Sequence, residues 1–365
     1  MNIFTKCNYK FSMFGGKMKI NKKLVFSILF FILMVVLTCF MLFKDNEIED
    51  VIAVAKNVDI SFLAICLGLV VIYLLFEAFY IYISFKSLKQ KTTLAKCFAY
   101  SSIEYYFSAI TPSSTGGQPF QSYYMAKDGI PVTKSSIVLL LNTITFKMIL
   151  LLLGIVCIIF KSSLVFSNGI LFNILFILGF LINLTIIVLC FLVMKSKNKV
   201  KKFVIWLINL LAKLRLKKEP ETTIRKIDEY MEDYRTGVKY LKKHPMLTLK
   251  VLGLTLIQRV AMFSIGYVVY LAFGLSGFSF FDFLTIQVII AIAIDSLPFP
   301  GGVGITEAML LKIYYGIYGA ELLTASVLLT RLFSYYSCLI ISGIVSLANH
   351  IRVMINDKAL KKEET

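Results

Sequence analysis

Apolar runs long enough to cross a lipid bilayer recur along this chain and restrict it to one broad class of fold. A helix needs about 20 apolar residues to cross a hydrocarbon core about 30 Å thick. Hydrophobic residues make up 58% of the 365 residues and charged residues 16%, which excludes an ordinary cytosolic enzyme. The runs that reach this length are 24–43, 60–85, 135–160, 170–194, 247–273 and 322–348. The sequence therefore predicts an all-α polytopic membrane protein with six full transmembrane helices.

The distribution of lysine and arginine predicts the orientation of these spans, because cytoplasmic loops are enriched in both residues. Of the 39 basic residues, 31 fall in 1–23, 86–97, 127–134, 195–246 and the tail from 349 onward. The stretches 44–59, 161–169, 274–282 and 319–321 contain only Lys44, Lys56 and Lys161. We expect the first group and both termini to be cytoplasmic and the second group to be external. The net charge of +18 then belongs to membrane loops, and direct nucleic-acid binding is not expected.

Two further apolar stretches are broken near their middle by proline, glycine and hydroxyl residues. The breaks read Thr111-Pro-Ser-Ser-Thr-Gly-Gly-Gln-Pro119 and Pro298-Phe-Pro-Gly-Gly-Val-Gly304. The spans that flank the first break both meet the cytoplasmic side, so residues 98–126 must enter and leave there. By the same reasoning, residues 283–318 enter and leave on the external side. The sequence thus predicts two re-entrant helical hairpins of opposite orientation.

Matching spacings indicate that the two hairpins belong to an inverted repeat. Lys147 follows Gly116 by 31 residues, and Arg331 follows Gly301 by 30. Many alternating-access transporters have this architecture, with the substrate site at the repeat interface near the membrane midplane. The alternative is two unrelated interruptions. The predicted parts are a basic leader (1–23), a first membrane half (24–194), a basic cytoplasmic connector (195–246), a second membrane half (247–348) and a tail (349–365).

The two breaks are the predicted binding site, because non-helical backbone inside a bilayer must be buried in protein or line a polar cavity. Hydroxyl side chains can cap helix ends, and the helix that restarts near Pro119 offers its amino end to a phosphate group. The helix that follows the second break likewise offers its amino end, from the opposite side of the membrane. The predicted headgroup-binding residues of the two breaks are Thr111, Ser113, Ser114, Thr115, Gly116, Gly117, Gln118, Pro300, Gly301, Gly302, Gly304 and Glu307.

Ionisable residues within the predicted membrane segments are the second set of candidates, since each costs about 2.5–3.5 kcal/mol at the bilayer centre. Lys147, Arg259 and Arg331 are predicted to neutralise a lipid phosphate. Glu77, Glu104 and Asp295 are predicted to be their charge partners in the cavity. The alternative is that these residues form static salt bridges within the bundle.

Signatures of catalysis and of cofactor binding are not evident in the sequence. The seven cysteines are scattered singly, and the two histidines, His244 and His350, lie in polar flanks. Gly274-Leu-Ser-Gly277 matches the G-x-S-G pattern of intramembrane proteases, but it lies at an external helix end without a membrane histidine as base. We therefore predict no catalytic residues, no metal and no cofactor.

The two breaks, in their order along the chain, resemble a known family. Together with Pro300-Gly-Gly-Val-Gly-Ile-Thr-Glu-Ala308 and Arg331-Leu-Phe-Ser-Tyr-Tyr336, they are similar to the transmembrane flippase region of the lysylphosphatidylglycerol synthase family over residues 20–350. The family implies a membrane flippase and, in longer members, a cytosolic domain that transfers lysine from lysyl-tRNA to phosphatidylglycerol. Movement of the product to the outer leaflet reduces negative surface charge and repels cationic antimicrobial peptides. We expect this chain to be a stand-alone membrane region without the transferase domain.

Three functions follow as hypotheses. The first is a phospholipid flippase of a bacterial-type plasma membrane that moves lysylphosphatidylglycerol or a related lipid. The expected partner is that membrane lipid, and the sequence is compatible with a homo-oligomer. The second is a membrane component of a phosphatidylglycerol lysyltransferase that works with a separate soluble transferase. The third, with weaker support, is an ion-coupled solute transporter.

Overall fold

The structure is a computed structural model that describes residues 58–111, 114–195, 239–240, 242–295, Leu297 and 299–363. Every regular element within these ranges is a helix. Five helical stretches there are long and apolar enough to cross a membrane: Ile60–Ser87, Val132–Phe166, Ile170–Leu189, Pro245–Ala272 and Pro300–Ile355. The prediction of an all-α polytopic membrane protein is confirmed. The predicted span 24–43 and most of the connector 195–246 lie outside the described residues, so the count of six spans stays a prediction.

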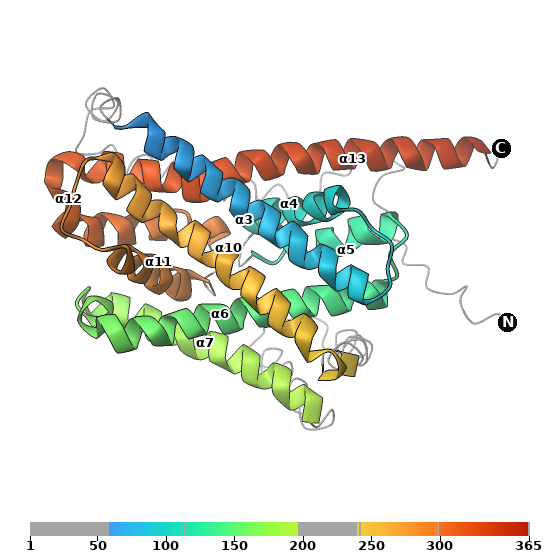
Figure 1. Ribbon diagram of the computed structural model, residues 1–365, viewed down its shortest axis with the longest axis horizontal. Coiled ribbons are helices and arrows are strands. Elements are labelled where there is room, and N and C mark those ends of the chain that lie inside the picture. Colours follow the sequence, from blue (N-terminus) through green and yellow to red (C-terminus); the bar gives the residue numbers. More distant parts are fainter. Residues whose placement is uncertain are drawn as a thin grey trace, which may run out of the picture.

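Four long helices form the body of the molecule: α3 (Ile60–Ser87), α6 (Val132–Phe166), α7 (Ile170–Lys195) and α10 (Pro245–Ala272). Helices α3 and α10 lie side by side and run in opposite directions (Figure 1). At one end of the molecule the Asp59 amide donates to the Ala272 carbonyl at 3.2 Å. We call this the Ala272 end. The opposite end, where α3 finishes and α10 begins, is the Asp128 end.

The first broken stretch forms a helical hairpin rooted at the Asp128 end. Helices α4 (Leu94–Ile110) and α5 (Gly117–Lys127) run inward and back. Their outer ends meet at Asp128, which lies 3.4 Å from the Lys96 ammonium and accepts a 2.5 Å hydrogen bond from Tyr100. At the inner turn, a Cβ on Gly117 would lie 2.6 Å from the Glu104 carbonyl oxygen, so glycine is required for the close packing of the two helices.

The second broken stretch forms a hairpin rooted at the Ala272 end. It consists of α11 (Phe280–Ile294), the short helix η2 (Pro300–Gly302) and the first part of α12 (Ile305–Arg331). Lys161 of α6 bonds Asp282 at 2.8 Å near the outer end of α11. Helix α12 reverses direction at Gly319, which has φ 68°. The two broken stretches thus form helical hairpins rooted at opposite ends of the molecule, and the re-entrant arrangement predicted for 98–126 and 283–318 stays a prediction.

After the reversal the chain runs the length of the molecule. The second part of α12 leads into the π-helix η3 (Leu332–Ser337) and then α13 (Cys338–Glu363). Helix α13 packs along the first hairpin and reaches the Asp128 end, where Arg352 bonds Asp128 at 2.7 Å (Figure 1).

The inner turns of the two hairpins touch each other near the middle of the molecule. Ala109, Val303 and Tyr335 are buried together there, and the Tyr335 hydroxyl donates to the Ala109 carbonyl at 3.2 Å. One apolar cluster surrounds the first hairpin and a larger one surrounds the second. The hairpin turns thus meet between these two cores, and a third apolar cluster packs α3 against α10. The assignment of the hairpins as an inverted repeat that re-enters a bilayer stays a prediction.

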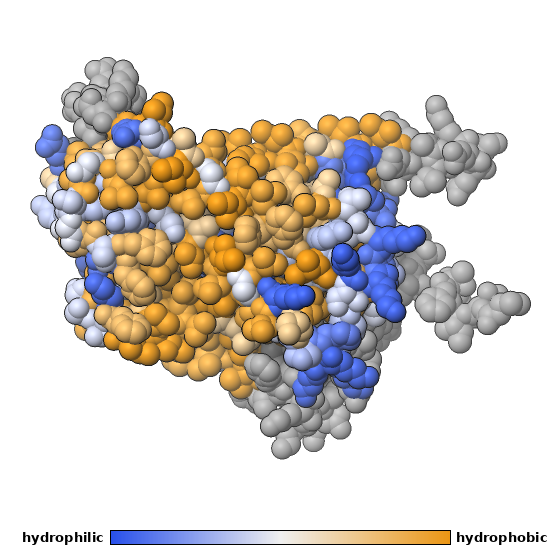
Figure 2. All heavy atoms as spheres, viewed as in Figure 1, coloured by the Kyte–Doolittle hydropathy of each residue, from blue (hydrophilic) through white to orange (hydrophobic). Residues whose placement is uncertain are grey.

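Apolar side chains cover the flanks of the molecule between its two ends. Figure 2 shows a broad hydrophobic surface, with hydrophilic residues gathered chiefly at the end where α3 finishes and α10 begins. Ile159 and Ile170 are 67% and 81% exposed. A surface of this kind is stable in lipid, whereas on a soluble protein it would drive association.

Close contact between α7 and α11 gives a prediction for the fold. A Cβ on Gly179 would overlap the Ile292 carbonyl and lie 3.3 Å from the Ala293 Cα, so Gly179→Ala should push the two helices apart. We expect the free energy of unfolding in detergent to fall by about 1–3 kcal/mol, the usual cost of overpacking. The matched control is Gly68→Ala in α3, where a Cβ meets nothing within 4 Å. Equal stability of the two variants would contradict the packing described.

Candidate functional site

The inner turn of the second hairpin holds a buried ion pair. The Arg331 Nε donates to Glu307 Oε1 at 2.6 Å, and the two residues are 6% and 1% exposed. Glu307 Oε2 also accepts the Gly304 amide at 2.7 Å and so caps the amino end of α12. The amino end predicted to face a phosphate is therefore occupied by the protein's own carboxylate.

Backbone shape places this ion pair beside an aromatic ring. Gly301, Gly302 and Gly304 all have positive φ, a region that glycine adopts without strain. A Cβ on Gly301 would overlap the Tyr335 ring, and the Arg331 guanidinium lies 4.5 Å from the centroid of the same ring. Tyr335 thus joins the second hairpin turn to Arg331 and to the first hairpin.

The inner turn of the first hairpin is organised by one hydroxyl. Thr111 Oγ1 donates to the Phe107 carbonyl at 2.6 Å and accepts the Gly116 amide at 2.9 Å. It therefore links the end of α4 to the start of α5, as the predicted capping role requires. Ser108 Oγ reaches Glu104 Oε1 at 3.0 Å just behind this turn.

The remaining residues predicted at this turn lie in different surroundings. Gln118 points to α6, where its Nε2 donates to Thr143 Oγ1 at 2.6 Å. Ser114 and Thr115 are exposed, whereas Gly116 is half-buried and Gly117 is buried. Ser113 lies outside the described residues.

A second charged group surrounds Arg259 of α10. Its guanidinium lies 4.1 Å from the centroid of the Phe146 ring and 5.4 Å from that of Tyr73, and it interacts electrostatically with Glu77 and Glu104. Glu77 is 2% exposed and accepts the Gln258 Nε2 at 3.1 Å. Three helices, α3, α4 and α10, thus bring two carboxylates to one arginine.

A second ion pair of this centre lies near the Phe146 ring. The Lys147 ammonium bonds Asp295 at the end of α11 and lies 5.3 Å from the Phe146 ring centroid. Lys147 and Arg259 therefore share one aromatic ring as a neighbour. Cations are attracted to the negative face of such rings, by about 2 kcal/mol or more when desolvated.

Tyrosines connect the Arg259 group to the hairpin turns. The Tyr73 and Tyr105 ring centroids are 5.9 Å apart, and the Tyr105 hydroxyl donates to the Tyr335 carbonyl at 3.4 Å. The predicted cations thus belong to one connected polar centre between the two cores, each with a carboxylate nearby.

Several residues of this centre were not predicted as site residues. They are Tyr73, Tyr105, Phe146, Gln258 and Tyr335. Only Tyr335 carried a signal, because it lies in the Arg331-Leu-Phe-Ser-Tyr-Tyr336 motif. The others are aromatic or amide residues in apolar runs, where the sequence does not distinguish a neighbour of a cation from ordinary core.

A metal site is not formed by the described residues. They contain no group of three or more His, Cys, Asp or Glu side chains able to hold a metal ion. Cys66, Cys97, Cys157 and Cys338 are buried free thiols.

Comparison with known proteins assigns the family. Residues 24–342 match the family described as the lysylphosphatidylglycerol synthase TM region. The chain belongs to this family. The family resemblance carried by the two breaks is thereby confirmed. The chain is also similar to a protein named UPF0104 membrane protein from Archaeoglobus fulgidus, with 24% identity over 238 residues that cover 63% of this chain and 69% of the relative.

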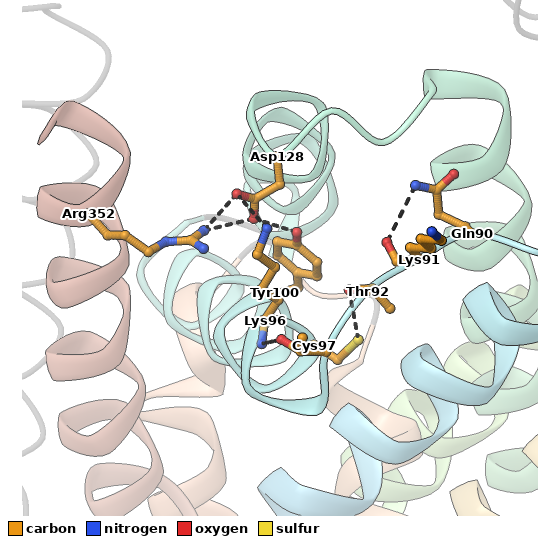
Figure 3. Close-up of polar contacts among 9 residues, drawn as sticks. Gln90, Lys91, Thr92, Lys96, Cys97, Tyr100, Asp128 and Arg352 are labelled. Atoms are coloured by element: carbon orange, nitrogen blue, oxygen red, sulfur yellow. Dashed lines mark hydrogen bonds and ion pairs between the residues drawn. The ribbon is translucent and has the colours of Figure 1, made fainter. Parts of the chain in front are cut away.

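A separate polar cluster closes the Asp128 end of this family member. Asp128 contacts Tyr100 and Lys96 of α4 and Arg352 of α13 (Figure 3). Burial alone would raise the pKa of the Asp128 carboxyl. The hydrogen bonds from Tyr100 and Arg352, together with the charges of Arg352 and Lys96, outweigh burial and lower this pKa. The cluster therefore ties α13 to both helices of the first hairpin.

This cluster gives a prediction for stability. Asp128→Asn should lower the free energy of unfolding at pH 7 by about 1.5–3 kcal/mol, the usual range when a hydrogen bond to a charged group is lost. Because the folded pKa lies below the usual value of 3.8, the carboxylate stabilises the fold above that value and the contribution is lost as pH falls through the folded pKa. Unfolding in detergent, followed from pH 7 downward, should show the variant and wild type converging only in acid. Glu321→Gln, at an exposed position, is the control.

Proposed function

We propose that this protein is a lipid translocase that moves an anionic or aminoacylated phospholipid, such as phosphatidylglycerol or its lysyl derivative, between leaflets. The observation that carries the proposal is the connected group of Lys147, Arg259 and Arg331 beside the meeting point of the two hairpin turns. A headgroup phosphate cannot cross hydrocarbon without a compensating charge. The buried Arg331 and the half-buried Lys147 and Arg259 provide that compensation, while the acyl chains stay in lipid.

Each cation is held by a carboxylate in the described conformation, and this suggests how a phosphate would enter. Glu307 occupies the amino end of α12 and bonds Arg331, which are the donors that a phosphate would seek. The Arg331 Nη2 is buried and has no hydrogen-bond partner among the described residues, so it can receive a further acceptor. Translocation would exchange the protein carboxylate for the lipid phosphate and then restore the pair.

The membrane arrangement is part of the same proposal. The first hairpin re-enters from the cytoplasm and the second from outside, as halves of an inverted repeat with six spans and both termini cytoplasmic. Exposed lysines at the Asp128 end support this orientation: Lys86, Lys89, Lys91, Lys127, Lys242, Lys243 and Lys250. In a bacterial-type plasma membrane, the activity would change surface charge and resistance to cationic peptides.

A second candidate function is favoured by the family description. A lysylphosphatidylglycerol synthase TM region can act as the membrane component that presents lipid to a separate soluble transferase. The purified chain, incubated with lysyl-tRNA and phosphatidylglycerol, distinguishes the two functions. Formation of aminoacylated lipid would favour a role in synthesis, and translocation without product would favour the flippase.

Paired neutralisation tests the role of the cations. Lys147→Met together with Asp295→Asn removes the cation without leaving a buried charge unpaired, a defect that is strongly destabilising. We expect translocation of fluorescent phosphatidylglycerol in proteoliposomes to fall at least about tenfold, which corresponds to about 1.4 kcal/mol of lost stabilisation. Lys250→Ala, at an exposed position, is the control. Wild-type translocation by a folded double variant would exclude Lys147 from the site.

Cysteine labelling tests the opposite orientation of the hairpins. In a cysteine-free background, Lys91→Cys and Ala126→Cys lie at the outer ends of the first hairpin, and Ser276→Cys and Ala320→Cys at those of the second. A membrane-impermeant maleimide added to intact cells should label only the second pair. Labelling of both pairs from the same side would contradict the proposed topology.

A further inference from the structure

Two carboxylates lie near Arg259, which carries a single positive charge. Lipid binding alone does not explain this imbalance of charge. Lys147 has Asp295 and Arg331 has Glu307, each in a direct ion pair. Arg259 interacts electrostatically with both Glu77 and Glu104. With all these groups ionised, the centre has one negative charge more than it has positive charges. A surplus charge in a low-dielectric interior is unstable, and a proton is the simplest ion that can cancel it.

Hydrogen bonding identifies Glu77 as the carboxyl that accepts the proton. Glu77 Oε2 accepts the Gln258 amide nitrogen at 3.1 Å. Glu77 Oε1 and Gln258 Oε1 are both buried, and neither has a hydrogen-bond partner among the described residues. Both atoms are acceptors, so no arrangement of these two side chains can satisfy them while Glu77 is ionised. One proton on Glu77 supplies the missing donor, and it removes the surplus charge at the same time.

The neighbours of Glu77 are consistent with a site for a single proton. Helix α4 contributes Glu104, α10 contributes Arg259 with Gln258, and α3 itself contributes Tyr73 and Tyr80. Tyr80 lies within hydrogen-bonding reach of the Glu77 carboxylate, but its hydroxyl donates to the amide oxygen of Asn142 of α6 at 2.7 Å. Helix η3, which also packs against α3, carries Tyr335 and Tyr336. Arg259 is therefore the cation that acts on this pair of carboxylates, and it can balance only one of them.

We propose that Glu77, supported by Gln258, is a proton-binding site that couples movement of an anionic lipid headgroup to movement of one proton in the same direction. The inference rests on the proposed translocase function. A phosphate bound at Arg259, whose Nε is buried and has no hydrogen-bond partner in the described part of the chain, brings negative charge next to the carboxylates. That charge favours the protonated form of Glu77, and by reciprocity the proton strengthens phosphate binding. When the lipid binds, one proton from water attaches to one carboxylate oxygen of Glu77. The proton and the lipid are then both released on the other side of the membrane.

The first test measures coupling in vesicles. The full chain is reconstituted in phosphatidylcholine vesicles that contain a trace of fluorescent phosphatidylglycerol, with the membrane potential held at zero. One proton per singly charged anion makes transport electroneutral, so each pH unit should shift the leaflet ratio about tenfold toward the leaflet at higher pH. Glu321→Gln, which alters an exposed carboxylate, should behave like wild type. Glu77→Gln should leave the ratio independent of the pH gradient.

Three results of this experiment would contradict different parts of the proposal. Lipid movement by wild type whose final distribution ignores the pH gradient would overturn the proton site and leave the translocase proposal standing. Failure of wild type to move the lipid under any gradient would overturn the translocase proposal, and the inference would fall with it. A gradient response retained by Glu77→Gln would remove Glu77 from the role.

If Glu77→Gln does not transport lipid, a binding measurement tests whether Glu77 takes up the proton. Calorimetry of short-chain phosphatidylglycerol binding in buffers of different ionisation enthalpy gives the number of protons taken up with the lipid. Wild type and Glu321→Gln should take up close to one proton per lipid bound, and Glu77→Gln should take up none. Equal proton uptake by wild type and Glu77→Gln would overturn the assignment.

Discussion

The cost of burying charge governs the centre of this protein. Three cations and four carboxylates lie where α3, α4, α6, α10, α11 and α12 meet, between two apolar cores. Each ionised group there must find a partner, because an isolated buried charge costs several kcal/mol. The hairpins meet that requirement: their turns bring backbone amides, hydroxyls and aromatic rings to a depth where unbroken helices have no free polar groups. Glycines with positive φ and close glycine contacts in the turns allow these groups to approach the charges.

Much of the fold was predictable, because its main signals are local. The run 60–85 corresponds to α3 at Ile60–Ser87, and the expected external stretch 319–321 begins at the reversal of α12. Length, hydropathy and lysine placement specify such features without reference to the rest of the chain. The two hairpins also followed from counting which side each span must meet.

The pairing of charges within the site was not predictable to the same degree. Lys147 and Asp295 are separated by 148 positions, and Arg331 and Glu307 by 24. Hydropathy identifies each of them as a membrane charge but does not state its partner, which depends on how the two hairpins approach each other. The capping of α12 by Glu307 has a different origin, because Glu307 lies only three residues after Gly304 and reaches back to its amide within the first turn of the helix. The sequence indicated a helix start that could receive an anion, but not that this neighbouring side chain is the anion.

The π-helix η3 lies directly between the two charged regions of the protein. It follows Arg331 at the centre and precedes the helix that carries Arg352 to the Asp128 end. A π-turn holds one residue more than the equivalent α-helical turn, and each residue turns an α-helix by about 100°. Conversion of Leu332–Ser337 to regular α-helix would therefore rotate α13 by about that angle relative to Arg331. These six residues therefore determine how α13, and with it Arg352 at the Asp128 end, is rotated relative to Arg331 at the centre. A change in their helical winding would transmit a rotation from one region to the other.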